Sequence, residues 1–104
     1  MRLSEYIKEN IPRQKLTDIC QRNDISFLGI FGSFARGNYS KKSDVDILIR
    51  FKKGASKTLF DIMDIEGGLR GIFHRKVDLI TVNSVSPYLK DEIIKSTVVI
   101  YEKR

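Results

Sequence analysis

The sequence predicts a buried strand over residues 45–51, with two acidic side chains at its start. The run is apolar along almost its whole length, yet Asp44 and Asp46 stand at positions i and i+2 at its start. On a strand, such side chains share one face and lie roughly 6.5–7 Å apart. Two like charges about 4 Å apart repel by roughly 4 kcal/mol at an effective dielectric of 20. A fold that brings such acids together needs a cation between them, or one of the acids must keep its proton. We favour the cation, because it explains more of the sequence pattern.

A glycine-serine pair precedes these acids by ten residues. Residues 25–31 form a short apolar run, typical of a strand covered on both faces, which ends at Gly32-Ser33. A strand that feeds a short helix in this way presents backbone N–H groups and a hydroxyl at the positive helix end, which is an anion site. Gly32 lets a phosphate approach without a Cβ in the way, and Ser33 can donate from its N–H and its hydroxyl. Arg36 lies within one helical turn of Ser33 and could contact phosphate, with a structural salt bridge as the alternative.

A third carboxylate, Asp78, lies in another apolar run, KVDLIT at residues 76–81. Asp44 and Asp46 supply the hard oxygen ligands that Mg²⁺ prefers, and Asp78 could complete a site for two metal ions. Phosphoryl and nucleotidyl transfer depend mostly on positioning and charge neutralisation, so this small set of groups can suffice. Neither Gly-Ser nor Asp-x-Asp is specific alone; the joint occurrence carries the prediction.

The remaining pattern alternates helices and strands. Helical spacing is expected over residues 3–20, divided or kinked at Pro12, and one helical turn over 34–37. A polar loop at 38–43 precedes the strand at 45–51, and a helix over 58–73 begins at a Thr58/Asp61 capping box. Gly67-Gly68 inside that helix predict a close contact or a kink. We expect a third strand at 77–82, a helix at 87–95 capped by Ser86, and a last strand at 97–101.

Together these elements predict one α/β (α+β) domain over residues 1–104, with a mixed four-stranded sheet packed against helices. The chain has a net charge of +6, which suggests an anionic partner such as a nucleotide, a nucleic acid or an acidic protein face. Its basic residues are scattered, so nucleic-acid binding is the minority interpretation. No membrane span or signal peptide is visible, and a lone cysteine, Cys20, fits a core position in a cytoplasmic protein.

The central residues resemble a known family. GSFARG at 32–37, followed by SDVDIL at 43–48, is similar to the signature of the polymerase-β-type nucleotidyltransferases, and residues 76–81 resemble its third-acid strand. The segment from 87–89 to 100–102 is similar to the tail of the minimal nucleotidyltransferase (MNT) antitoxins, the partners of HEPN toxins.

The resemblance implies a small nucleotidyltransferase fold that uses ATP and Mg²⁺ to transfer AMP to a hydroxyl. In HEPN–MNT pairs, it implies adenylylation of a tyrosine of a HEPN ribonuclease toxin, and therefore a stable hetero-oligomer. Carried over, Gly32 and Ser33 would hold the triphosphate, Asp44 and Asp46 would bind metal, and Asp78 would bind metal or act as the general base.

Two other functions stay open. The chain could be an antitoxin that neutralises its toxin by occlusion alone, with the acids as a relic. It could instead be a nucleotidyltransferase that acts on RNA ends or on a small molecule, which the net charge of +6 would suit. Retained neutralisation without the acids would favour the first, and labelled RNA without a protein partner would favour the second.

Overall fold

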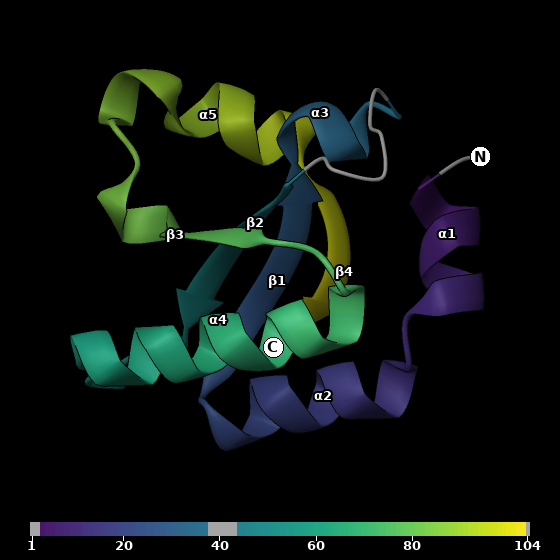
Figure 1. Ribbon diagram of the computed structural model, residues 1–104. Helices are drawn as coiled ribbons and strands as arrows, with labels where there is room; N and C mark the ends of the chain where they lie inside the picture. The colour runs from purple at the N-terminus through teal and green to yellow at the C-terminus, as the bar shows by residue number, and fades with distance from the viewer. Residues whose placement is uncertain (1–2, 38–43, 104) are drawn as a thin grey trace.

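In the part of the chain that the structure describes, four strands form one mixed sheet in the order β3-β2-β1-β4 (Figure 1). The computed structural model describes residues 3–37 and 44–103, apart from the side chain of Ser4. Strand β1 pairs antiparallel with both β2 and β4, whereas β2 and β3 run parallel. In chain order the elements are α1 (Leu3–Asn10), α2 (Arg13–Arg22), β1 (Ile25–Phe31), α3 (Gly32–Ala35), β2 (Val45–Phe51), α4 (Leu59–Phe73), β3 (Val77–Thr81), the 3₁₀ helix η1 (Val82–Ser84), α5 (Pro87–Ser96) and β4 (Val98–Glu102). The predicted fold class is confirmed.

Local sequence signals place most of these elements. Pro12 separates α1 from α2, and the apolar runs predicted as strands at 25–31 and 45–51 are β1 and β2. The Thr58 hydroxyl accepts a hydrogen bond from the Asp61 N–H, and the Asp61 carboxylate accepts one from the Thr58 N–H, which completes the predicted capping box of α4. The Ser86 hydroxyl accepts from the Tyr88 N–H at the start of α5.

Three predicted elements have different bounds in the structure. Helix α3 begins at Gly32 rather than at Phe34, so the glycine-serine pair lies inside the helical turn. Strand β3 ends at Thr81, because the chain turns into η1 at Val82, and β4 runs one residue later than expected because Thr97 still caps α5. The predicted loop at 38–43 lies outside the described residues.

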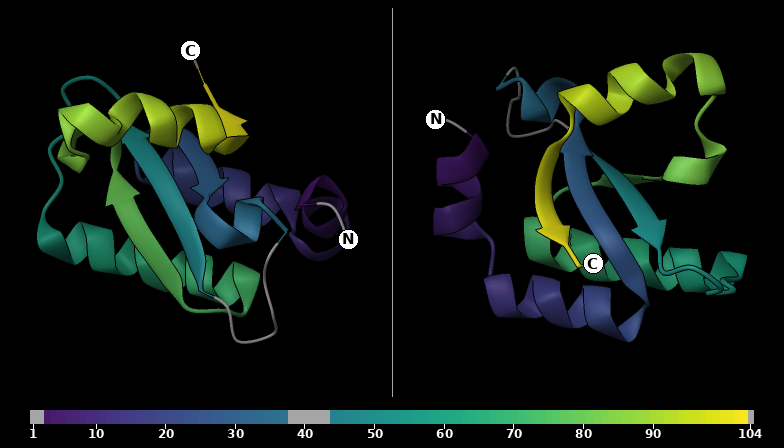
Figure 2. Two further views of the ribbon diagram at one scale, coloured as in Figure 1. Left: turned by 90° about the horizontal axis from the view of Figure 1, so that it is seen from above. Right: turned by 180° about the vertical axis from the view of Figure 1, so that it is seen from behind.

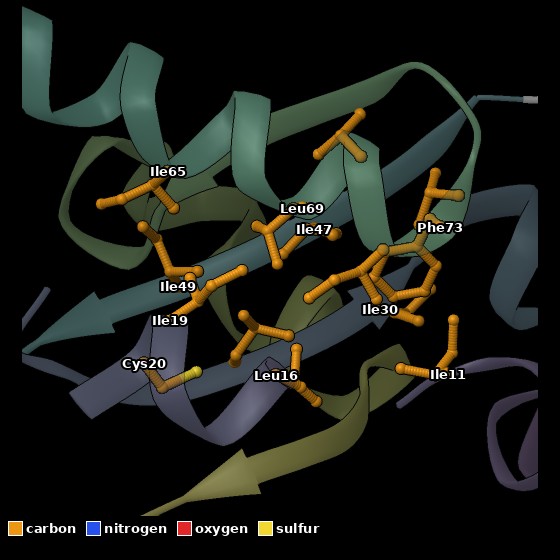
Figure 3. Packing of buried hydrophobic residues seen from close by; sticks show 14 of the residues in the cluster. Ile11, Leu16, Ile19, Cys20, Ile30, Ile47, Ile49, Ile65, Leu69 and Phe73 are labelled. Atoms are coloured by element: carbon orange, nitrogen blue, oxygen red, sulfur yellow. The ribbon is translucent and has the colours of Figure 1, made fainter. Parts of the chain in front are cut away.

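The two faces of the sheet are covered unequally. Helices α2 and α4 pack on one face, where the larger core cluster gathers side chains such as Leu16, Ile47 and Phe73 (Figure 3). Cys20 lies in this cluster, as predicted, and burial raises the pKa of its thiol to about 12. Gly68 of α4 allows the close approach of Ile19 from α2, whereas no atom of another described segment lies within 4 Å of a Cβ built at Gly67. The predicted packing contact is therefore confirmed at Gly68.

Helix α5 crosses the opposite face of the sheet (Figure 2). The core there is small: Phe27, Leu48 and Val82 are buried, and Phe31, Ile80, Val85 and Ile93 pack against them in part. No residue of α5 is fully buried. Among the described helices, none is long and apolar enough to cross a membrane.

A buried hydroxyl on β4 leads to a stability prediction. The hydroxyl oxygen of Tyr101 is buried, and no described group hydrogen-bonds to it. An unsatisfied buried hydroxyl is unfavourable, so Tyr101→Phe should leave the free energy of unfolding unchanged or raise it by up to about 1 kcal/mol in urea titrations. Tyr88→Phe is the control, because Tyr88 is 94% exposed and its change should be silent. A loss above about 1 kcal/mol for Tyr101→Phe would mean that the hydroxyl has a bound partner such as water.

Candidate active site

The three acids singled out in the sequence meet at one end of the sheet. Strands β2 and β3 are in parallel register, which sets Asp46 directly beside Asp78. On its other side Asp46 pairs with Phe31, the last residue of β1. Asp44 precedes β2 by one residue and lies two positions before Asp46. Neighbouring strands and the strand period of two therefore bring together side chains that are up to 34 positions apart in the sequence.

Strand periodicity also tells which face of the sheet these acids occupy. Leu48 and Ile80 belong to the small core under α5, and Asp46 and Asp78 stand two residues before them on the same strands. Alternate strand residues point to the same side, so both acids lie on the face that α5 crosses. The larger core, between the sheet and α2 and α4, is on the other face. The acids are thus at the thinly covered face, where a ligand can reach them.

Gly32 lies directly against the carboxylate of Asp46. Its backbone has φ +76°, a left-handed conformation that side chains rarely adopt, and a Cβ at this position would overlap Oδ2 of Asp46. Two separate constraints therefore demand glycine here. Ser33 follows in the same helical turn and is half-buried, and the turn is closed by a hydrogen bond from the Arg36 N–H to the Gly32 carbonyl at 3.2 Å. The glycine-serine pair and the acids are one continuous site.

The electrostatics of the cluster centre on Asp46. Burial raises the pKa of the Asp46 carboxyl above its ordinary value, and the neighbouring carboxylates of Asp78 and Asp44 raise it further. The Arg36 guanidinium acts in the opposite direction and lowers that pKa. The site therefore holds more negative charge than its surroundings compensate, which is the situation that a bound cation relieves.

The raised pKa of Asp46 makes stability depend on pH. The folded chain holds this proton more tightly than the unfolded chain does, so the free energy of unfolding falls as pH rises from the unfolded-state pKa through the higher folded-state pKa. Above that interval the ionised carboxylate is destabilising. Asp46→Asn should therefore raise the thermal midpoint at pH 7 in EDTA, and the gain should vanish below the ordinary pKa of aspartate.

Thermal unfolding followed across this pH range checks the prediction. Asp64→Asn removes a charge from the exposed face of α4 and serves as the control. An Asp46→Asn variant that is less stable than the wild type at pH 7 would contradict it.

One cation at this site was missed in the sequence, where Lys76 counted only as one of many scattered basic residues. Its Nζ lies 4.0 Å from Oδ2 of Asp44. The signal that could have found it is its spacing, because Lys76 stands two residues before Asp78 and directly ahead of β3. His74, by contrast, is an exposed C-cap residue of α4 with φ 55°.

The acids do not form a closed metal cage by themselves. Over residues 3–37 and 44–103, no three Asp, Glu, His or Cys side chains are arranged to hold an ion alone. Mg²⁺ in nucleotide sites does not require such a cage, because one or two carboxylates share it with substrate phosphates and water. The donor set at Asp44 and Asp46, beside an open glycine turn, fits that kind of site.

Comparison with known proteins places the chain in a family. The family model described as polymerase beta, nucleotidyltransferase matches residues 14–104. A predicted protein adenylyltransferase of Methanocaldococcus jannaschii is 35% identical over 86 residues, which cover 83% of this chain and 90% of that relative. The chain therefore belongs to the polymerase β nucleotidyltransferase family.

Solved structures share the fold. A predicted minimal nucleotidyltransferase superposes with a TM-score of 0.74 at 26% identity, covering 94% of this chain and 95% of its own. A second match is a chain from the complex of a tri-AMPylated Shewanella oneidensis HEPN toxin with its MNT antitoxin. It has a TM-score of 0.62 at 17% identity and covers 88% of this chain and 70% of its own. At that identity the likeness concerns the fold alone.

Proposed function

We propose that this chain is a Mg²⁺-dependent protein adenylyltransferase that transfers AMP from ATP to a tyrosine of a HEPN-type toxin and thereby acts as its antitoxin. The observation that carries the proposal is Asp46, which packs against Gly32 and is flanked by Asp78 and Asp44 in a member of the nucleotidyltransferase family. The adenylyltransferase name of the archaeal relative and the AMPylated toxin of the structural neighbour support the choice of nucleotide and acceptor.

Each residue of the site has a proposed role. Asp44 and Asp46 hold Mg²⁺, with Asp78 as a ligand for a second ion or as the general base. Gly32 leaves room for the triphosphate beside the backbone, Ser33 donates hydrogen bonds to it, and Arg36 adds positive charge. When bound, the ion neutralises phosphate charge and favours ionisation of the attacking hydroxyl.

The proposed reaction is a substitution at the α-phosphorus of ATP. The tyrosine oxygen forms a bond to the α-phosphorus, the bond from that phosphorus to the bridging oxygen of the β-phosphate breaks, and pyrophosphate leaves. The proton of the tyrosine hydroxyl goes to the carboxylate of Asp78 where that residue acts as the base. Positioning and charge neutralisation supply most of the rate for such transfers.

A protein acceptor suits the surface of the domain. Leu59, Phe60 and Met63 on one side of α4 are 73%, 77% and 59% exposed, and Tyr88 and Leu89 of α5 are exposed as well. Clustered exposed apolar side chains are typical of proteins that work in complexes. We propose a stable hetero-oligomer with the toxin, and place it in the cytoplasm, where ATP is available and the single cysteine stays reduced.

An assay with labelled ATP shows which molecule accepts the AMP group. The chain is incubated with Mg²⁺ and ATP labelled at the α-phosphate, together with its cognate HEPN toxin or with total tRNA. Label retained on the toxin, absent when the label is on the γ-phosphate, is the expected result. Label on the tRNA instead would favour the RNA-directed enzyme. No label anywhere, combined with full neutralisation of the toxin by the chain and by its Asp44→Asn plus Asp46→Asn variant, would favour occlusion.

A further inference from the structure

Four charged residues, Asp44, Asp46, Lys76 and Asp78, form a block at the end of the sheet where β2 and β3 begin. The parallel register sets Val45 beside Val77 and Asp46 beside Asp78. Asp44 and Lys76 immediately precede these two strands; the Val45 N–H donates to the Lys76 carbonyl at 2.9 Å, and the Lys76 Nζ lies 4.0 Å from Oδ2 of Asp44. Asp46 and Asp78 lie on one face of the sheet, and the contact of the Lys76 ammonium group with Asp44 places Lys76 beside them. The backbone hydrogen bond and the side-chain contact together place Lys76 at the acid site.

The two rows of this block carry different charge. The inner row, Asp46 and Asp78, contains two carboxylates, whereas the outer row pairs the Asp44 carboxylate with the Lys76 ammonium. Both partners of the outer row are accessible, at 65% for Lys76 and 42% for Asp44. Burial does not hold the Asp44–Lys76 pair together, so the long lysine side chain can move into solvent without disturbing the strands.

We propose that Lys76 is a positioning residue of this site: its ammonium group holds Asp44 in the block when no divalent ion is bound, and it must release Asp44 when an ion binds. The inference rests on the metal binding proposed above for the acids. A divalent ion on Asp44 would stand within a few ångströms of the ammonium, and two cations so close repel each other. Lys76 therefore weakens divalent-ion binding to the free chain.

Substitutions that change the charge at position 76 stepwise test this role of Lys76. Mn²⁺, which also prefers oxygen ligands, is titrated calorimetrically into the full chain without nucleotide. Lys76→Met should bind Mn²⁺ about two- to fivefold more tightly than the wild type, as expected for removal of an exposed charge partner. Lys76→Glu should bind more tightly still, because it adds a carboxylate to the block, and Lys76→Arg should stay near the wild type. The differences should shrink in high salt.

Lys53 provides the matched control. It is an exposed lysine that follows β2 at the end opposite to the acids, so Lys53→Met and Lys53→Glu change the net charge equally but far from the block. Their Mn²⁺ affinity should stay close to that of the wild type. As a second readout, Lys76→Glu should unfold at a lower temperature than Lys53→Glu in EDTA, and Mn²⁺ should close this gap.

The outcomes distinguish this inference from the proposed function. Wild-type binding of Mn²⁺, with Lys76 variants that match either the wild type or the Lys53 variants, overturns the role of Lys76 alone. No Mn²⁺ binding by the wild-type chain overturns the metal site and this inference with it. Failure to label the toxin, with the graded Mn²⁺ series intact, overturns only the proposed acceptor.

Discussion

Replacing Asp46 by asparagine should slow transfer of AMP to the toxin by on the order of 10³-fold or more, which corresponds to several kcal/mol in the barrier. Asp46 is the central acid of the cluster, with Asp78 beside it, Asp44 before it and Gly32 against it. Asparagine keeps the shape of the side chain but removes the charge that would hold a cation. The fold should survive, because the same change is expected to raise the thermal midpoint at pH 7.

A single-turnover assay with saturating ATP and toxin measures this loss. Asp64→Asn makes the same chemical change on the exposed side of α4 and should leave the rate unchanged. Because thermal unfolding reports on the fold separately, a slow but stable Asp46→Asn variant assigns the loss to the site. An Asp46→Asn rate within tenfold of the wild type would show that this carboxylate does not hold the metal ion.

Gly32→Ala should be the second most damaging change. The added methyl group would overlap the Asp46 carboxylate, and φ +76° is strained for alanine. Strain of this kind costs about 1–2 kcal/mol of stability. Displacement of the carboxylate by about 1 Å should slow AMP transfer by roughly 10²-fold, because misplacement of this size is that costly to catalysis.

A matched change at Gly54 separates the loss of stability from the loss of AMP-transfer rate. Gly54 also has a positive φ, +85°, but none of the described atoms outside its chain neighbours lies within 4 Å of a Cβ built there, and it lies in the connection after β2, away from the acids. Gly54→Ala should therefore lose similar stability with no loss of rate in the same assay. Equal rates for Gly32→Ala and Gly54→Ala would mean that contact between Gly32 and Asp46 has no part in catalysis.

Much of the fold follows from local sequence chemistry. The runs that became β1 and β2 are almost continuously apolar, so only a strand covered on both faces suits them. Thr58 and Asp61 cap α4, and Ser86 caps α5, because their side chains form hydrogen bonds with nearby backbone groups. Such signals act over a few residues and can be interpreted without knowledge of the tertiary structure.

The features that sequence reasoning missed depend on contacts between distant segments. Helix α3 begins at Gly32, whose position is shaped by a carboxylate fourteen residues later, at Asp46. Lys76 became part of the site only through the parallel register of β2 and β3, which the sequence alone does not reveal. The acids themselves could be predicted, because a carboxylate in an apolar run is anomalous wherever the strand is placed.

The central claim is that Asp44, Asp46 and Asp78 gather divalent ions beside the Gly32-Ser33 turn. A crystal structure of the chain with Mn²⁺ and a non-hydrolysable ATP analogue, with the ions located by anomalous scattering, tests it most directly. We expect an ion bound at the carboxylates of Asp44 and Asp46, with the triphosphate against Gly32. An ion bound elsewhere, or a nucleotide seated away from these acids, would contradict the account.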